Sequence, residues 1–592
     1  MSTEVASLKA SVIRIPSPES SGTPAVRRLI AVMLFVSILL GVIAAWHGGN
    51  LWINDDGVSY LDLADAWLAR DWQTVANGYW SPGYPWLLAI GLSISRHPVF
   101  WEPVVVRAVN LLMYLGALFA FLFFWRELTD YTVRCTRPIR WENESPGGAW
   151  WFFGFVLFLY CAIGLIKVSS DCADMCVAAV VFAASAILIR IRNGELSPGT
   201  FVAFGATLGL GYLMKAVMLP LTLVFVASAL LAAPNRKKAV TGLVLTLLTF
   251  GLISAPWVLL LSTAKHRLTF GDSGRLNYVW YANYGAITGP ARTSYFFPWR
   301  GSPGGGAPVH PMRQLLSSPE VDEFKAPFRA SYPPWNDPSY WYEGVKVRFD
   351  LRQQLQPLKR SMATYLSFVE DQAALVVAAL FLIILAGVSG VTTALKQGTY
   401  LVLPALAAFG LFALILVADR YIGPFVLLFW AAVFSELYVV NRELKPRILS
   451  ALFLAAALAL SLPVIKSSSQ DVMKTVQGFR AHELFSHEDA DVADSLGKLG
   501  LRPGDRIGYI QSPGDALNKY WARLAKVTII ADMPSRDVEE FWNADPATKD
   551  KVVAAFKEAG ARVIVAYNVP PAAQNGWQRV QRSDYYVLPC PK

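Results

Sequence analysis

The run LIAVMLFVSILLGVIAAW at residues 29–46 contains no charged side chain, and the acidic pair Asp55-Asp56 follows it. The hydrocarbon core of a bilayer is about 30 Å thick, so a helix needs roughly 20 apolar residues to cross it. The run therefore predicts a membrane-spanning helix. The chain then places two adjacent carboxylates close to the end of that helix.

Ten further apolar runs follow along the chain. They lie at 103–125, 149–167, 172–190, 200–213, 216–233, 240–262, 373–395, 399–417, 422–440 and 448–465. The runs 200–213 and 216–233 could also form one broken hairpin. The segment 82–95 is short and interrupted by proline, which suits a helix lying at the membrane interface. The expected fold class is an α-helical polytopic membrane protein with about eleven transmembrane helices.

The composition supports this class. The 592 residues are 54% hydrophobic and only 16% charged, with a mean hydropathy of +0.39. These proportions exclude a disordered, collagenous or ordinary soluble protein. The mean hydropathy is too low for a chain buried in lipid throughout, so a large part of the protein must face water.

Positive charges mark alternate short loops between the runs. With the N-terminus in the cytoplasm, the cytoplasmic side receives Arg27, Arg28, Arg126, Arg134, Arg137, Arg140, Arg190, Arg192, Arg236, Lys237, Lys238, Lys396, Arg442, Lys445 and Arg447. The opposite short turns hold only isolated cations, chiefly Lys215 and Arg420. Because Lys and Arg favour cytoplasmic loops, the net charge of +10 orients the spans rather than marking a nucleic-acid binder.

This orientation predicts three regions of the chain. They are a cytoplasmic tail (1–28), a transmembrane module (29–466) with external loops at 47–102 and 263–372, and an external C-terminal domain (467–592). Within the last, β-rich runs beginning at Ile507, near Val527 and at Val563 alternate with helical stretches at 515–525 and 548–559. That alternation predicts a small α/β domain.

The pair Asp55-Asp56 is the first candidate for chemistry. Carboxylates at a membrane boundary are costly unless they meet a cation, a metal or a proton to accept, and a general base needs such surroundings. Asp is also a preferred helix N-cap, and taken alone the pair is explained by a cap. The aromatic residues Tyr60, Tyr79, Trp80 and Tyr84 lie in the same loop. Their rings suit a sugar face or a prenyl chain, and equally the anchoring of a protein at the interface.

Four further ionisable residues fall on the external side. Asp171 and Asp174 open the fourth span; Asp171 suits a surface turn as well as a site, whereas Asp174 lies one turn inside an apolar helix, where a charge is expensive. Lys215 stands at the apex GLGYLMK and could hold a phosphate, or simply extend its amine to the interface. Arg420-Tyr421 repeats this theme, with a local ion pair to Asp419 as the alternative.

Nucleotide-binding and metal motifs do not occur in the sequence. Its 5 cysteines lack metal or redox spacing, and its first apolar run lacks a signal-peptide cleavage site. The sequence also has no GxxxxGK[ST] and no strand-anchored GxGxxG, so no motif supports nucleotide binding. An enzyme acting on the external face would therefore need a donor carried in the membrane.

In order and spacing, these residues resemble the clan-C (GT-C fold) membrane glycosyltransferases, which include the protein O-mannosyltransferases and lipid A aminoarabinose transferases. The resemblance extends to about residue 440. It rests on Asp55-Asp56 after the first span, the proline-containing helix that follows, the acidic start of the fourth span, the GLGYLMK apex, and Arg420-Tyr421. Family members often have Asp-Glu at the first pair, and a Lys-Pro-Pro turn where this chain has Ser81-Pro82-Gly83.

The resemblance implies a role for each position. Asp55 would be the general base for a single inverting displacement, Asp56 would support it, and Asp171 or Asp174 would complete the acidic side. Lys215 and Arg420 would bind the donor phosphate, and Tyr60, Tyr79, Trp80, Tyr84 and Tyr421 would contact substrate. The donor would be a polyprenyl-phosphate-linked monosaccharide, and the acceptor a lipid, glycan or protein. No cofactor would be required, although a divalent cation is compatible with the carboxylates. The protein would lie in a bacterial inner membrane, among membrane lipids.

Two other functions remain open. A lipid-linked saccharide transporter would also place charges in a helix bundle, but near the midplane of the membrane. A surface receptor would explain the C-terminal domain but not the ionisable residues gathered on one side. The loop 263–372 is rich in aromatic residues and proline, and is expected either to select the acceptor or to act as a structural lid.

Overall fold

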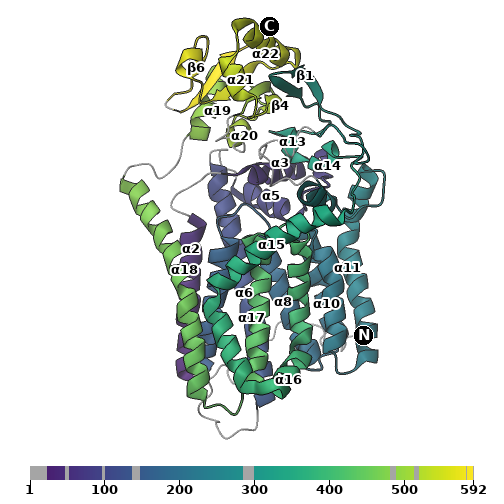
Figure 1. The fold of residues 1–592 in the computed structure, drawn as a ribbon, viewed down its shortest axis with the longest axis vertical. Coiled ribbons are helices and arrows are strands. Elements are labelled where there is room, and N and C mark those ends of the chain that lie inside the picture. Colours follow the sequence, from purple (N-terminus) through teal and green to yellow (C-terminus); the bar gives the residue numbers. More distant parts are fainter. Residues whose placement is uncertain are drawn as a thin grey trace. The chain divides into compact units, whose positions relative to one another are not determined.

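The computed structural model describes residues 23–46, 53–95, 101–136, 147–283, 299–480, 488–511, 519–581 and 583–590. The chain divides into two compact units (Figure 1). Unit 1 comprises Met1–Gly48, Asn110–Trp257 and Lys359–Gln477, and unit 2 comprises Gly49–Val109, Val258–Leu358 and Gly478–Lys592.

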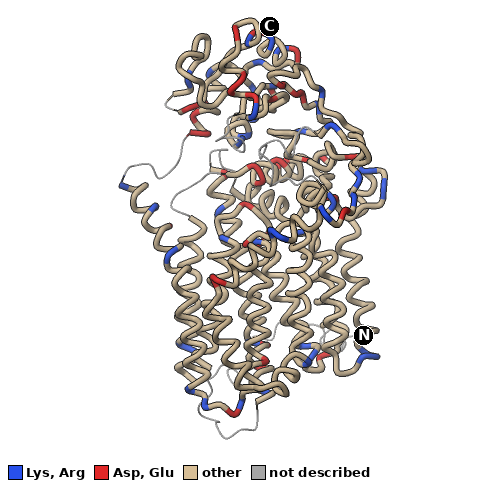
Figure 2. Tube along the Cα trace, in the orientation of Figure 1, with Lys and Arg blue, Asp and Glu red and all other residues tan. Residues whose placement is uncertain are grey.

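Unit 1 is helical. Its elements are α2 (Pro24–Trp46), most of α6 (Glu102–Thr136), α7 (Gly147–Leu159) with the π-helix η4 (Tyr160–Ile166), α8 (Asp174–Arg192), α9 (Pro198–Met214), α10 (Met218–Ala232), most of α11 (Arg236–Ala264), the C-terminal part of α15 (Leu351–Asp371), α16 (Ala373–Ala413), α17 (Asp419–Val440) and most of α18 (Pro446–Arg480). Figure 2 shows most of the length of these helices without charged residues.

The helices confirm a multi-pass membrane protein. Eight helices within the described residues are long and apolar enough to cross a membrane, and α5 (Gly83–Ser95), α9 and α10 are shorter apolar helices. Each predicted span falls on one of these helices, and α9 and α10 are separate. The break expected between 395 and 399 lies instead at Gly387, whose φ of 62° and ψ of 179° interrupt α16. Glycine lacks a Cβ and adopts this conformation without steric cost.

Unit 2 combines short helices with a sheet. Its helices are α3 (Asp55–Ala69), α4 (Trp72–Val75), α5, α12 (Ser273–Tyr278), the π-helix η5 (Val279–Asn283), α13 (Pro333–Asn336), α14 (Pro338–Trp341), α19 (Glu488–Lys498), α20 (Tyr520–Leu524), α21 (Val538–Asn543), α22 (Pro546–Glu558) and the 3₁₀ turn η6 (Pro571–Ala573). Most of the predicted external loops, residues 49–102 and 263–358, thus share one compact unit with residues 478–592, whereas 359–372 and 467–477 belong to unit 1.

The sheet confirms the α/β character of the C-terminal part. The strands described are β1 (Arg313–Ser317), β2 (Glu320–Glu323), β3 (Arg506–Ile510), β4 (Thr528–Met533), β5 (Val563–Tyr567), β6 (Gln578–Arg579) and β7 (Tyr585–Pro589), in the order β1-β2-β4-β3-β5-β7-β6. The three predicted strands are β3, β4 and β5, and β3 pairs in parallel with both others.

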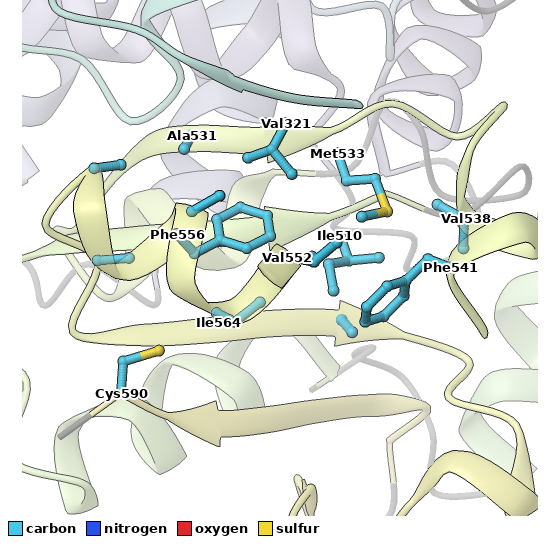
Figure 3. Packing of buried hydrophobic residues seen from close by; sticks show 14 of the residues in the cluster. Val321, Ile510, Ala531, Met533, Val538, Phe541, Val552, Phe556, Ile564 and Cys590 are labelled. Carbon is cyan, nitrogen blue, oxygen red and sulfur yellow. The ribbon is translucent and has the colours of Figure 1, made fainter. Parts of the chain in front are cut away.

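Alternate residues of the central strands fill two apolar cores. Ile510 and Ile564 pack with Phe556 of α22 and Phe541 of α21 on one face (Figure 3). Tyr509, Val565 and Val563 pack with Trp521 of α20 and Leu496 of α19 in the other core. The period-two alternation of strand side chains produces this separation.

The β1–β2 hairpin comes from the loop 263–372, and the sequence analysis did not predict it. Strand β2 carries three buried carboxylates and pairs antiparallel with β4. Arginine offsets the cost of burying these charges: Arg300 lies 2.7 Å from Asp322, and Arg313 lies 2.6 Å from Glu323. A strand of acidic residues shows no apolar alternation, so the pattern used to find strands misses it.

Candidate active site

Most of the predicted site residues fall into two clusters, one in each unit. We call Asp174, Lys215, Arg420 and Tyr421 of unit 1 the cation cluster. The acid cluster, in unit 2, contains Asp55 and Asp56 together with Lys519, which the sequence did not predict as a site residue. Tyr60, Tyr79, Trp80 and Tyr84 belong to the same unit as Asp55.

Helix ends bring the cation cluster together. Asp174 is the first residue of α8, Lys215 follows the last residue of α9, and Arg420 is the second residue of α17. A Cβ at Gly211 would lie 2.7 Å from Val180 Cγ1, so glycine is what lets α9 approach α8 closely one turn before Lys215. The N-terminus of α8 also favours the negative charge of Asp174.

Asp174 binds both cations. Lys215 Nζ donates a hydrogen bond to Asp174 Oδ1, and Arg420 Nε lies 3.6 Å from Asp174 Oδ2. The Asp174 side chain is 3% exposed, whereas those of Lys215 and Arg420 are 29% and 28% exposed. Lys215 Nζ lies 3.9 Å from the centre of the Tyr421 ring, a cation–π contact.

This arrangement leaves the cluster with one net positive charge and two partly exposed donor groups. Such a combination suits a phosphate, because ammonium and guanidinium groups bind phosphate oxygens through charge-assisted hydrogen bonds. Arg420 pairs with Asp174 of another helix, whereas the alternative expectation was a local ion pair with Asp419. Of the two acidic residues near α8, Asp174 forms the ion pairs with Lys215 and Arg420. Asp171 is buried in the turn before the helix.

Helix α3 presents the acid cluster. Its N-cap is Asn54, whose Oδ1 accepts a hydrogen bond from the Gly57 backbone N–H at 2.7 Å. Asp55 and Asp56 occupy the first turn. The capping role proposed for the pair therefore belongs to its neighbour.

Asp55 and Asp56 contact different partners. Asp55 Oδ2 lies 3.4 Å from Lys519 Nζ, and both side chains are buried. Asp56 Oδ1 accepts a hydrogen bond at 3.1 Å from Trp335 Nε1, in the loop 263–372. The two adjacent carboxylates thus have distinct environments, one cationic and one aromatic.

The surroundings of Lys519 are also polar and buried. Its Nζ lies 4.9 Å from the centre of the Tyr332 ring and 5.7 Å from that of Tyr509. The Tyr332 hydroxyl donates to Asp532 Oδ2 at 2.7 Å, and Gln511 Nε2 donates to the same oxygen. Burial raises the pKa of Asp532 to about 6, although these hydrogen bonds and the charge of Lys519 oppose the shift.

The four predicted aromatic residues pack into one group with Trp335. The Tyr60 ring centre lies 4.8 Å from that of Trp80 and 4.9 Å from that of Tyr84, and Tyr79 lies 4.6 Å from Trp80. The Trp335 carbonyl accepts hydrogen bonds from Ser59 Oγ at 3.1 Å and Trp80 Nε1 at 3.2 Å. Tyr84 and Trp80 are buried, whereas Tyr60 and Tyr79 are partly exposed. Trp335 thus joins the aromatic group to Asp56.

Sequence reasoning missed Lys519 altogether. Lys519 and Arg523 stand one helical turn apart around Trp521, which is the available signal for two cations on one face. Nothing in the local pattern indicates that these cations face α3. Among the residues that the structure describes, no group of three or more His, Cys, Asp or Glu side chains is arranged to hold a metal ion.

One comparison with a known protein, ArnT with a TM-score of 0.50, supports the architecture. No family model and no curated protein matches the sequence. ArnT from Cupriavidus metallidurans bound to undecaprenyl phosphate matches with a TM-score of 0.50 and 13% identity, over 95% of this chain and 99% of that one. Its apo state matches with a TM-score of 0.48 and 15% identity, over 96% and 100%. The Archaeoglobus fulgidus oligosaccharyltransferase in complex with Zn and sulfate matches with a TM-score of 0.48 and 12% identity, over 93% and 71%.

The likeness to ArnT extends over almost the whole of both chains, and at 13% identity it establishes the fold. That fold agrees with the apolar helices and the small C-terminal sheet described above. The chain therefore has the GT-C membrane fold, as its sequence predicts.

Proposed function

We propose that this protein is a membrane glycosyltransferase that transfers a monosaccharide from a polyprenyl-phosphate donor to an acceptor hydroxyl. The cation cluster carries the proposal. Two partly exposed cations share the buried carboxylate of Asp174 at the ends of apolar helices, which suits the phosphate of a lipid. ArnT, whose fold this chain shares, is bound to undecaprenyl phosphate.

In the proposed reaction, Lys215 and Arg420 bind the phosphate that links the sugar to the polyprenyl chain. The acceptor oxygen attacks the anomeric carbon as the bond from that carbon to the phosphate oxygen breaks. Polyprenyl phosphate leaves with the bonding electron pair, and the two cations stabilise its added charge. The displacement inverts the anomeric centre.

Asp55 serves as the general base of this step. Its carboxylate takes the proton of the acceptor hydroxyl, so the nucleophile develops negative charge only as the new bond forms. Asp56, held by Trp335, positions the neighbouring carboxylate. Tyr60, Tyr79, Trp80 and Tyr84 support the sugar and acceptor side, and Tyr421 borders the donor phosphate. Asp171 supports the turn that leads to Asp174.

The reaction takes place at the external face of a bacterial inner membrane, with the N-terminus in the cytoplasm. The loops 47–102 and 263–372 of the transmembrane module 29–466 then face outward, as does the domain 467–592, and the tail 1–28 faces inward. The proposed activity requires no cofactor. Turnover measured with and without EDTA tests whether a divalent cation contributes. The acceptor is a lipid, glycan or protein hydroxyl.

The test uses the full chain, reconstituted with undecaprenyl-phosphate monosaccharides and candidate acceptors, and measures released undecaprenyl phosphate and glycosylated acceptor. Replacing Asp55 by Asn removes the base and should lower turnover by about 10²–10⁴-fold. Asp494→Asn, at a side chain that is 51% exposed on α19, is the matched control and should retain native turnover.

Three results would overturn the proposal. Turnover that survives Asp55→Asn removes Asp55 as the base. No turnover of any donor, combined with labelled lipid crossing the membrane of proteoliposomes, shows a transporter. Binding of acceptors with neither activity shows a receptor.

A further inference from the structure

The short helix α20 of the C-terminal part packs against α3, the helix that carries Asp55. Asp55 and Asp62 are two turns apart on one face of α3. Lys519 and Arg523 are one turn apart, and they meet these two carboxylates in the same order along the helices. Lys519 Nζ lies 3.4 Å from Asp55 Oδ2, and Arg523 Nη1 lies 2.7 Å from Asp62 Oδ1.

Arg523 holds the two elements together. Besides Asp62, its guanidinium contacts Asp65 at 2.9 Å and Glu102 at 2.7 Å. The side chains of Arg523, Asp62 and Glu102 are all buried, and Asp62 also accepts hydrogen bonds from the Ser331 backbone N–H and hydroxyl. Breaking a buried ion network leaves uncompensated charges, so the register between α3 and α20 is strongly favoured.

That register places Lys519 against Asp55. The Lys519 side chain is 2% exposed and that of Asp55 9%, so solvent screens their attraction little. Burial alone would favour the protonated carboxyl, which cannot accept a proton, whereas an adjacent cation favours the carboxylate. The ion pair therefore opposes the effect of burial on the proposed base.

We propose that Lys519 is a positioning residue that keeps Asp55 ionised and oriented, and that the C-terminal α/β part thereby completes the active site. This inference rests on the proposed function in taking Asp55 as the base. The C-terminal α/β part then belongs to the catalytic apparatus, because removing Lys519, the N-cap of α20, alters the base even though Lys519 touches neither donor nor acceptor.

Several other charged or titratable groups surround this pair. They are Asp56 and Asp62 on α3, Tyr332 in the segment before α13, Tyr509 on β3, Asp532 on β4 and Arg523 on α20. Lys519 is a cation in direct contact with Asp55. Its removal should therefore affect Asp55 more than a change at any of the others.

The experiment follows protonation of Asp55 without requiring turnover. Dicyclohexylcarbodiimide modifies buried carboxyl groups only when they are protonated, and mass spectrometry of the Asp55 peptide measures modification as a function of pH. In the full-length Lys519→Met variant, the midpoint of modification should rise by about 1–3 pH units relative to native. Lys519→Arg should restore a midpoint close to the native value, since it keeps the charge. Lys526→Met, at an exposed lysine after the same helix, is the matched control and should leave the midpoint unchanged.

The same variants are then compared in donor turnover. For Lys519→Met, the acid limb of the pH profile should move upward with the modification midpoint, and kcat at neutral pH should fall about tenfold or more with little change in KM for the donor. Lys519→Arg should recover most of kcat. If the native chain turns over no donor, the proposed function fails while the modification midpoint still tests the ion pair.

The apparent Tm of the variants distinguishes a loss of charge pairing at Lys519 from a loss of side-chain packing. If Lys519→Met lowers the apparent Tm, the neutral pair Asp55→Asn with Lys519→Met should recover it, because neither charge is then buried alone. An unchanged midpoint in Lys519→Met overturns the proposal. So does a native pH profile in an active Lys519→Met enzyme.

Discussion

A single buried carboxylate organises the cation cluster at the residue scale. Asp174 binds Lys215 and lies within 3.6 Å of Arg420, so two like charges are held close together at the ends of helices. The carboxylate neutralises one of them, and the remaining charge favours an anion. Asp174 thus holds the two cations in a fixed geometry.

The first prediction concerns Lys215. Replacing it by Ala should weaken binding of polyprenyl phosphate by about 10–100-fold, because a hydrogen bond to a charged group contributes roughly 1.5–3 kcal/mol. Titration of full-length protein with a fluorescent polyprenyl phosphate measures the affinity. Lys237→Ala, at an exposed lysine in the first turn of α11, controls for lost charge. Equal affinity in the native and Lys215→Ala chains would contradict the phosphate role.

Asp532 predicts a pH dependence of stability. Its pKa is raised from an ordinary 3.8 to about 6 in the folded protein. A carboxyl group whose pKa is higher in the folded state contributes its full stabilisation at pH values below its unfolded pKa. This contribution is lost as the pH rises through the folded pKa. The difference between the two pKa values corresponds to about 3 kcal/mol. The apparent Tm of the native protein minus that of Asp532→Asn should therefore fall as pH rises from about 4 to about 7. A difference independent of pH would show that Asp532 titrates normally.

Helix α16 shows how one residue determines an element. Its 41 residues contain an apolar run that sequence analysis divides near Lys396, yet the backbone changes direction at Gly387. Composition sets where helices occur, but the break depends on a left-handed conformation that only glycine adopts easily. A neighbouring lysine is a weaker signal than this backbone requirement.

Gly387→Ala should therefore destabilise unit 1. An alanine at a φ of 62° and ψ of 179° is strained, at a cost on the order of 1–3 kcal/mol. Gly410→Ala in the same element is the control, since its helical backbone leaves open space for a Cβ and it should be neutral or slightly stabilising. Apparent Tm values in one detergent compare the two. Similar Tm values for both variants would mean that Gly387 does not need its left-handed conformation.

At the scale of the whole molecule, each unit gathers segments that are distant in the sequence. Unit 2 draws on three separate stretches, and its sheet takes β1 and β2 from one and the other strands from another. Most of the proposed external regions thus belong to one compact unit. These segments therefore fold together as one compact unit and not as independent loops.

The orientation across the membrane is the prediction at this scale. A cysteine replacing Asp494 in unit 2 should react with a membrane-impermeant maleimide in intact cells, whereas one replacing Lys237 should react only after the membrane is opened. Both positions are exposed, so accessibility depends on the side of the membrane. The native chain, whose described cysteines are unbridged, measures the background. The reverse labelling pattern would invert the topology.

Helices, their membrane character and the three central strands could be predicted because hydropathy and periodicity are local. Asp55, Asp174, Lys215 and Arg420 could be singled out because charges beside apolar runs are costly. The β1–β2 hairpin and the break at Gly387 could not, since burial of acidic strand residues depends on distant arginines and the break depends on one backbone conformation.

The sequence by itself therefore determined the class of protein and which ionisable residues stand at the ends of its helices. Only the tertiary structure decided their partners: Asp174 with Lys215 and Arg420, and Asp55 with Lys519, which lies 464 positions along the chain. The physical reason is the distance along the chain over which each interaction acts. Apolar periodicity is a property of neighbouring residues, whereas a buried ion pair exists only where packing brings two distant charges together and excludes water from both.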